Sequence, residues 1–337
     1  MPVNVEFVEK SEYAYAVARI RAIETKLVDS KGYNTIITSP MDRFFAVFSE
    51  VAGVKVDGVS ELRSVLKSLE DSFTGTLYMI KSLILEDEII RLVSLKYDYE
   101  LLKLILKESK GHETAIPTEI SERSNYSYPV LKSLLEGGKA LETGGIIYEA
   151  YASLIEAKDQ SGNFIDNQCD RAYYAELFRI LEGYGNSFLY EYFTRKIDAI
   201  NITTTFRLKL QGAKRSSIRE RALPFGSIDV SYLEQGIDLN LEGFSSKIIF
   251  SPLSRVLSGS GKTDDEEEQV ALVERLLEEE LIKFLKESLF VTFGIEPLLA
   301  YLWVRETEVR NLRTILLAKN AGVDDDEIKK HVRGYNV

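Results

Sequence analysis

The stretch DEIIRLVSLKYDYELLKLILKES, residues 87–109, is a long amphipathic run. Apolar residues that recur at three- and four-residue spacing line one face of an α-helix. This spacing is clear in EYAYAVARIRAIETKLV (12–28), and long runs of the same style cover 187–212, 264–289 and 296–322. Helical period dominates the chain, and we therefore expect an all-α fold.

The short β-branched runs NTIIT (34–38) and SSKIIF (245–250) are the only strand candidates, and we interpret them as helix flanks. PMDRFFAVFSEVAGV (40–54) begins with Pro40 and has Gly53 near its end. Proline at the start and glycine at the end is the order that helix termini favour, so this run is predicted to be a helix.

The composition limits the classes of function. A chain of 337 residues, 45% hydrophobic and 28% charged, can form two domains or one elongated repeat assembly. Its 42 basic and 53 acidic residues give a net charge of −11, which argues against nucleic acid as a partner. One cysteine, Cys169, allows no intramolecular disulfide, and with the separated His112 and His331 it builds no zinc cluster.

The sequence carries no pattern for membrane insertion. Acidic residues stand near the N-terminus, where a signal peptide would have a basic region and an apolar core. No segment reaches 18 uninterrupted apolar residues. We expect a soluble, cytoplasmic protein without direct membrane insertion, whose contact with a membrane would run through a partner.

An internal repeat is visible. The segments SPMDR (39–43), SYPVLK (127–132) and SPLSR (251–255) share a proline, an apolar residue and a base. Roughly 60 residues after each proline comes a long helix with an acid near its middle. The spacing predicts three similar helical modules of about 100 residues each. A helix-rich chain can also produce loose matches of this kind by chance.

The acids of the repeat are Asp98, Asp198 and Glu308. Asn201 and Asn311 follow the second and third acids by three residues, which places acid and amide on one side of a helix; the first helix has Leu101 there. We interpret the three acids as residues that order the module helices. The predicted modules are 1–112, 113–213 and 214–337.

Within VLSGSGKTDDEEEQV (256–270), the residues GSGKT look like the end of a phosphate-binding loop. The pattern G-x-x-x-x-G-K-[ST] requires a glycine where Val256 stands, and a run of acids follows where phosphates would have to lie. We interpret the stretch as a linker that leads into a helix capped at Thr263, with Glu266 completing a capping box. Acids suit the positive end of a helix.

No group of residues in the sequence assembles an active site. Paired carboxylates fall in solvated charge runs, and Cys169 lacks a catalytic signature and is interpreted as a structural thiol. The basic cluster LQGAKRSSIRER (210–221) lacks interleaved aromatics, so it suits an acidic protein surface better than nucleic acid. We expect no catalytic residues, no cofactor and no bound metal.

Three segments carry a family resemblance: IEPLLAYLWVRETEVRNLRTILLAKNAG (295–322), TRKIDAINITTTFRLKLQGA (194–213) and YAYAVARIRAIETKLVD (13–29). They resemble the C subunits of the archaeal-type and bacterial V-type ATP synthases, a family related to the d subunit of the eukaryotic vacuolar ATPase. The residues that fit the family pattern are Tyr301, Arg305, Glu308, Asn311, Leu312 and Arg313, together with Asp198, Asn201 and Arg207. The first module departs from the pattern because it lacks the asparagine.

The resemblance implies a funnel of three helical modules with pseudo-threefold symmetry. It also implies a non-catalytic rotor subunit without a cofactor, which lies on the cytoplasmic face of a membrane proteolipid ring and receives the central shaft subunits of an ATPase. The alternative is a free-standing all-helical repeat scaffold, although solenoid repeats have shorter periods. A helical nucleotide enzyme would rest on GSGKT alone.

Overall fold

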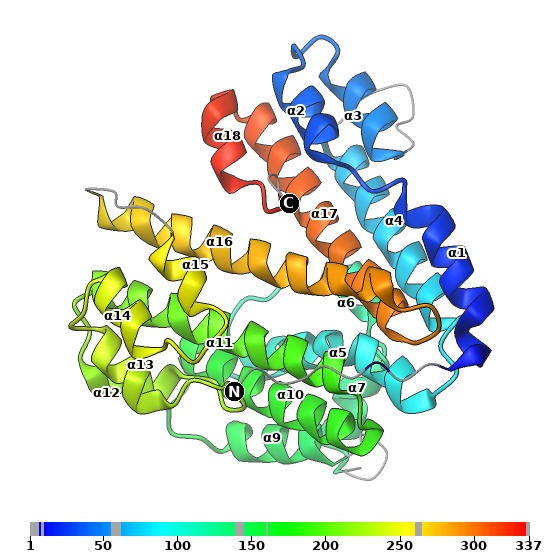
Figure 1. The fold of residues 1–337 in the computed structure, drawn as a ribbon. Helices are drawn as coiled ribbons and strands as arrows, with labels where there is room; N and C mark the ends of the chain where they lie inside the picture. Colours follow the sequence, from blue (N-terminus) through cyan, green and yellow to red (C-terminus); the bar gives the residue numbers. More distant parts are fainter. Residues whose placement is uncertain are drawn as a thin grey trace. The chain divides into compact units, whose positions relative to one another are not determined.

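In a computed structural model, the chain forms helices joined by connections (Figure 1). The structure describes residues 7, 10–54, 62–138, 145–159, 161–259 and 265–334. Every regular element in these ranges is an α-helix or a 3-10 helix, so the all-α prediction is confirmed. The larger of two compact units comprises Met1–Leu83, Ser187–Glu220 and Ser227–Val337, and the smaller comprises Ile84–Asn186 and Arg221–Gly226.

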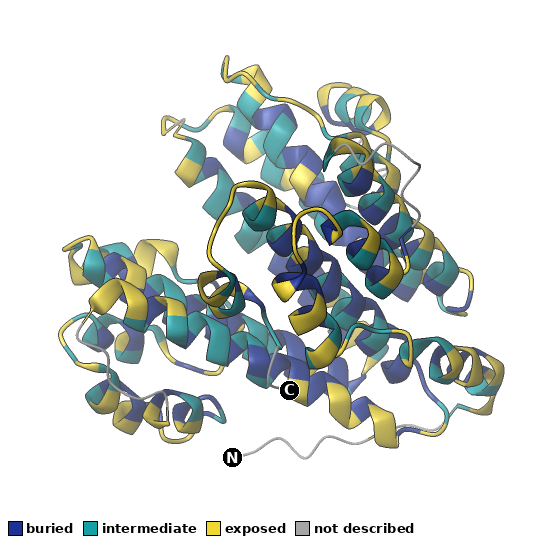
Figure 2. Cartoon of the chain, turned by 90° about the horizontal axis from the view of Figure 1, so that it is seen from above, coloured by how far each residue is buried: buried dark blue, intermediate teal, exposed yellow. Residues whose placement is uncertain are grey.

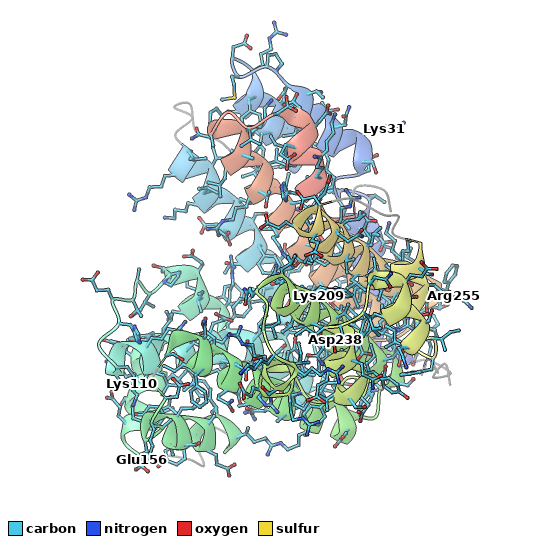
Figure 3. The ribbon with its side chains drawn as sticks, turned by 90° about the vertical axis from the view of Figure 1, so that its left-hand side faces the viewer. Lys31, Lys110, Glu156, Lys209, Asp238 and Arg255 are labelled. Atoms are coloured by element: carbon cyan, nitrogen blue, oxygen red, sulfur yellow. The ribbon has the colours of Figure 1, made fainter. Side chains whose placement is uncertain are left out.

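The smaller unit is built on two long helices that pack against each other, α5 (Asp87–Ser109) and α10 (Gly162–Tyr184). Helix α9 (Ile146–Ile155) contacts both, and α6 (Thr118–Arg123) and α7 (Tyr128–Glu136) pack on α5. At the end of α5, Lys110 Nζ donates a hydrogen bond of 2.6 Å to the carbonyl of Ile155, beside Glu156 (Figure 3). The last carbonyls of a helix have no hydrogen-bond partner within the helix, and Lys110 supplies one for the carbonyl at the end of α9.

One part of the larger unit brings together the two ends of the described chain. It contains a 3-10 turn, η1 (Ser11–Tyr13), and helices α1 (Ala14–Glu24), α2 (Ser30–Thr38), α3 (Phe44–Ala52), α4 (Leu62–Lys81), α17 (Glu296–Asn320) and α18 (Asp325–His331). Helix α17 packs mainly against α4 and also contacts α1, α2 and α18. The blue and red segments of Figure 1 therefore lie side by side.

The other part of the larger unit is built on α11 (Ser187–Leu210) and α16 (Glu266–Lys286), which pack together. Shorter helices, α12 (Arg215–Arg221), α13 (Val230–Gly236), α14 (Leu241–Lys247) and α15 (Ser254–Ser258), connect them, and η2 (Glu287–Phe290) follows α16. Lys209 Nζ, near the end of α11, donates to the carbonyl of Leu239 at 2.5 Å, next to Asp238 (Figure 3). This bond fixes the connection between α13 and α14 on α11.

Burial follows the helical period in both units. Buried residues lie along one side of most helices and exposed residues along the other (Figure 2). Gly236, at the end of α13, shows how close the packing is, because a Cβ there would meet the ring of Phe244 at 2.8 Å and Thr205 of α11 at 3.1 Å. A side chain at this position would push α13 away from α11.

Most helix ends lie within about two residues of the ends of the predicted runs, although α1 ends four residues before the run 12–28 does. Helix α5 has the predicted limits, and α3 ends before Gly53, whose φ of 63° is the left-handed conformation that closes many helices. Helix α3 begins at Phe44, later than Pro40 suggested, because 41–43 form a turn. The two strand candidates fall in or beside α2 and α14, as interpreted.

The three acid-bearing helices each pack against a helix of another predicted module. These pairs are α5 with α10, α11 with α16, and α17 with α4. In the last pair, Arg305 Nη2 of α17 donates a hydrogen bond of 3.0 Å to Ser72 Oγ of α4. These two residues are 233 positions apart in the chain. The division into modules 1–112, 113–213 and 214–337 stays a prediction. Within the described ranges, no helix is both long and apolar enough to cross a bilayer.

Candidate functional site

The three acids of the sequence repeat are buried, with 1% of Asp98, 1% of Asp198 and 3% of Glu308 exposed. They lie on α5, α11 and α17, near the middle of each helix. A buried carboxylate is costly unless it is hydrogen-bonded or paired with a cation. Their bonding partners therefore define what these residues do.

Asp98 holds the connection that leads into α7. One carboxylate oxygen accepts the backbone N–H of Asn125 at 2.7 Å, and the other accepts Asn125 Nδ2 at 2.7 Å. The same amide group also donates to the carbonyl of Arg91 at 3.1 Å. Ser127, the first residue before α7, follows two positions later. The bonds set where α7 begins.

Asp198 does the same for α13. It accepts the backbone N–H of Ile228 at 3.1 Å and the hydroxyl of Ser227. The next residue, Asp229, is the N-cap of α13, and its side chain accepts the N–H of Ser231 at 2.8 Å. A second connection is thus fixed by an acid in the middle of a long helix.

Glu308 holds the connection between α1 and α2. It accepts the backbone N–H of Val28 at 2.6 Å and pairs with Arg305, one turn earlier in α17. Asp29, which follows Val28, is the N-cap of α2. All three acids therefore accept a backbone N–H located one or two residues before the N-cap of a shorter helix.

Burial raises the pKa of the two aspartates. The pKa of Asp98 rises to about 7 because the carboxyl is desolvated, while the two bonds from Asn125 and the charge of Arg91 act against this rise. The pKa of Asp198 rises to about 6 for the same reason, and the bonds from Ser227 and Ile228 oppose it. The carboxylates accept backbone hydrogen bonds, which suits an ordering role.

Asn311 fixes the C-terminal segment. Its Nδ2 donates to the carbonyl of Arg333 at 2.6 Å and its Oδ1 accepts the N–H of Arg333 at 2.9 Å. Nδ2 also lies 3.3 Å from the hydroxyl of Tyr33 on α2. Asn201, at the matching position of α11, is also buried. Its backbone carbonyl accepts a hydrogen bond of 2.9 Å from the hydroxyl of Thr205.

Three of the α17 residues that fit the family pattern line a cavity of about 360 Å³. Tyr301, Glu308 and Asn311 line it, with Tyr33 from α2 and Arg333 from the C-terminal segment. Tyr301 is half-buried, and desolvation raises the pKa of its hydroxyl. Sequence reasoning missed Tyr33 and Arg333, which carry no repeat signal.

Two further residues that fit the family pattern, Arg207 and Arg313, form surface ion pairs. Arg207 of α11 donates two bonds to Glu274 of α16, at 2.6 and 2.9 Å. Arg313 of α17 donates to Glu70 of α4 at 3.1 Å. Both arginine side chains are more than half exposed, so these pairs contribute little to stability although they join paired helices.

The smaller unit holds a buried network that sequence reasoning missed. Glu176 of α10 is fully buried, accepts the hydroxyl of Tyr99 at 2.7 Å and pairs with Arg91. Its position inside the apolar run AYYAELFRIL, 172–181, was the available signal. The network joins α5 and α10. Cys169 of α10 is buried, and desolvation raises its thiol pKa to about 12, which makes it unreactive.

The predicted cap of α16 needs a correction. The helix begins at Glu266, and its N-cap is Asp265, whose side chain accepts the N–H of Glu267 at 2.8 Å and of Glu268 at 3.3 Å. The cap is therefore not Thr263, which lies outside the described residues together with Lys262. Several neighbouring residues could cap, and an aspartate is at least as good a cap as threonine.

The comparison with known families now decides the assignment. Residues 16–331 match the family described as ATP synthase (C/AC39) subunit. This range contains all three acid-bearing helices and the helices paired with them.

The chain belongs to the ATP synthase (C/AC39) subunit family.

Relatives of this C/AC39 subunit align along most of their length. The C subunit of the A-type ATP synthase of Thermococcus kodakarensis is 26% identical, over 95% of this chain and 90% of the relative. The C subunit of the A-type ATP synthase of Methanococcoides burtonii is 27% identical, over 96% of this chain and 94% of the relative. The C subunit of the V-type sodium ATPase of Enterococcus hirae is 27% identical, over 74% of this chain and 75% of the relative. The resemblance predicted from the sequence is confirmed.

Among the described residues, no cluster of three or more His, Cys, Asp and Glu side chains is arranged to hold a metal ion. Asp98, Asp198, Glu308 and Asn311 instead accept backbone N–H groups of their own chain. Asp98 lies in the smaller unit, while the residues that fit the family pattern lie in the larger one.

Proposed function

We propose that this chain is a non-catalytic central-stalk subunit of an A/V-type ATPase or ATP synthase. In this role it couples the central shaft subunits to the membrane proteolipid ring and transmits torque between them. It lies on the cytoplasmic side of the membrane as a peripheral part of the complex. The observation that carries the proposal is the family match over residues 16–331.

The chemistry of the signature residues supports a mechanical role. A coupling part needs stiffness and two binding surfaces, and close-packed helices transmit strain. Asp98, Asp198 and Glu308 stiffen connections by accepting backbone N–H groups. We further propose the three-module arrangement, with pseudo-threefold symmetry, for which the similar bonding of these three acids is the support.

Binding to the two proposed partners tests this function. The whole chain is immobilised and incubated separately with detergent-solubilised proteolipid ring and with the shaft subunits, and its ATPase activity is measured alone. We expect binding to both partners and no ATP turnover. Binding to neither would reject the rotor role and favour a free-standing helical scaffold. Intrinsic turnover would reject the non-catalytic role.

A further inference from the structure

A second cavity, of about 270 Å³, lies within the larger unit between α11, α16 and α17. Helix α11 contributes Lys196, Thr203 and Thr204, whose spacing of seven and eight residues places them on one face. Helix α17 contributes Trp303, and α16 contributes Leu281. All three walls also carry other residues, and charged side chains are among them: Glu278 on α16 and Arg310 on α17. We name this cavity the Lys196 groove.

Lys196 is the unusual member of this groove. Within the part of the chain that the structure describes, its amine forms neither a hydrogen bond nor an ion pair, and it lies 5.9 and 5.8 Å from the ring centres of Tyr192 and Phe193. The hydroxyls of Thr203 and Thr204 likewise have no hydrogen-bond partner in the described ranges. Three residues that line the groove therefore carry donors whose bonding capacity is unused within the described ranges.

The other charged groups around the groove already have partners. Arg207 pairs with Glu274 at 2.6 Å and Arg310 with Glu278 at 3.1 Å. Glu278 also forms an ion pair with Arg333, whose Nε lies 2.9 Å from the carboxylate, and Glu306 has a partner as well. Glu274 and Glu278 are thus paired with arginines, and neither bonds to Lys196.

The surroundings of Lys196 favour an anion. Desolvation and the positive charge of Arg310 lower the pKa of its amine to about 8, and Glu278 only partly offsets them. A carboxylate beside the amine would restore the ammonium form and supply a charge-assisted hydrogen bond. Trp303, stacked on Tyr192 with ring centres 4.5 Å apart, offers an apolar wall for the remainder of such a ligand.

We propose that the Lys196 groove binds an organic carboxylate, whose anionic group pairs with Lys196 and the hydroxyls of Thr203 and Thr204. The apolar stem of the ligand packs on Trp303 and Leu281. This chemistry is shared by a free short-chain carboxylic acid and by an Asp or Glu side chain of a partner protein. The volume of the groove is small for a ligand site, which matches a short stem.

The first arm of the test measures the reactivity of Lys196 in the isolated chain. The chain is acetylated at about pH 7.5 and the rate at each lysine is read by mass spectrometry, with and without butyrate. Lys283, an exposed lysine of α16, is the internal control. We expect butyrate to slow acetylation of Lys196 about tenfold in a saturable way, since a rise of one pKa unit lowers the neutral fraction tenfold. Lys283 and samples with neutral butyramide should show no change.

A variant without a charge change tests the hydroxyls. The double substitution Thr203→Val and Thr204→Val keeps the shape of the side chains and removes both donors. We expect it to weaken butyrate protection of Lys196 severalfold while the far-UV circular dichroism stays that of the parent chain.

The second arm identifies the source of the carboxylate. The chain assembled with its partner subunits is treated with a carbodiimide, which joins an amine to a carboxylate in direct contact. A crosslink from Lys196 to a partner peptide would assign the groove to a partner's acidic side chain. Butyrate protection without that crosslink would assign it to a free acid. A crosslink from Lys196 to Glu274 or Glu278 of the same chain, or neither protection nor a crosslink, would overturn the proposal.

Discussion

Replacing Glu308 with alanine should destabilise the larger unit strongly. The side chain is 3% exposed, and its removal leaves the Val28 N–H without its acceptor and Arg305, 8% exposed, without its carboxylate. Ser72 then remains as a hydrogen-bond partner of the guanidinium. Breaking a buried ion pair costs about 3–5 kcal/mol. The Val28 N–H is only partly buried, so the loss of its acceptor adds little to this cost.

We therefore expect Glu308→Ala to cost about 4 kcal/mol, most of it from the broken ion pair. The measurement is urea unfolding followed by circular dichroism, with the midpoint converted through the m-value. The double variant Glu308→Ala with Arg305→Ala should recover part of the loss, because it also removes the unpaired charge. Glu308→Gln should cost less than alanine, since an amide oxygen can still accept the Val28 N–H.

The matched control is Arg313→Ala on the same helix. Its side chain is 54% exposed and its ion pair with Glu70 lies at the surface, so the change should cost at most about 1 kcal/mol. Equal, small effects of the two alanine variants would refute the ordering role of Glu308. So would a Glu308→Ala chain with an unchanged unfolding midpoint that no longer binds the shaft subunits, because the glutamate would then serve the interface.

Three further outcomes follow from the structure. The raised pKa of Asp98 means that the folded state holds its proton more tightly than the unfolded state. Its contribution to stability is therefore fully present below about pH 4 and falls by up to about 4 kcal/mol as the pH rises to 7. Asp98→Asn should flatten that slope in pH-dependent urea unfolding. Asp265→Ala should cost about 1 kcal/mol in the same assay and Thr263→Ala almost nothing; the reverse order would restore the threonine cap. Lys262→Ala should leave assembly and ATP turnover of the whole complex unchanged, and a severe loss of turnover would revive the phosphate-loop hypothesis.

The sequence predicted the helices and the acids well because both depend on local pattern. Apolar spacing located α5 to the residue, and the repeat singled out Asp98, Asp198 and Glu308, which are all buried. Their partners could not be predicted in the same way. Glu308 bonds to Val28, 280 positions away, and no local rule connects two such positions.

Glu176 and the cap of α16 show two other limits. A glutamate in a helical run is ordinarily solvated, and only the packing of α10 on α5 shows that Glu176 is fully buried. Before α16, threonine and aspartate stand within three positions and each could cap. The choice of Asp265 depends on where the chain enters the helix, which is a property of the fold rather than of the motif.

The pairing of α4 with α17 has a consequence for synthesis on the ribosome. Residues 84–186, nearly the whole smaller unit, emerge as one continuous stretch. Their helices can therefore pack against one another as soon as this stretch has been translated. Helix α4 emerges earlier, yet its principal partner is among the last segments to be translated. The apolar face of α4, including Val65, Leu69 and Phe73, must then wait uncovered through most of translation. The N-terminal segment of a nascent chain is thus more exposed to aggregation, and in greater need of a chaperone, than the segments translated later.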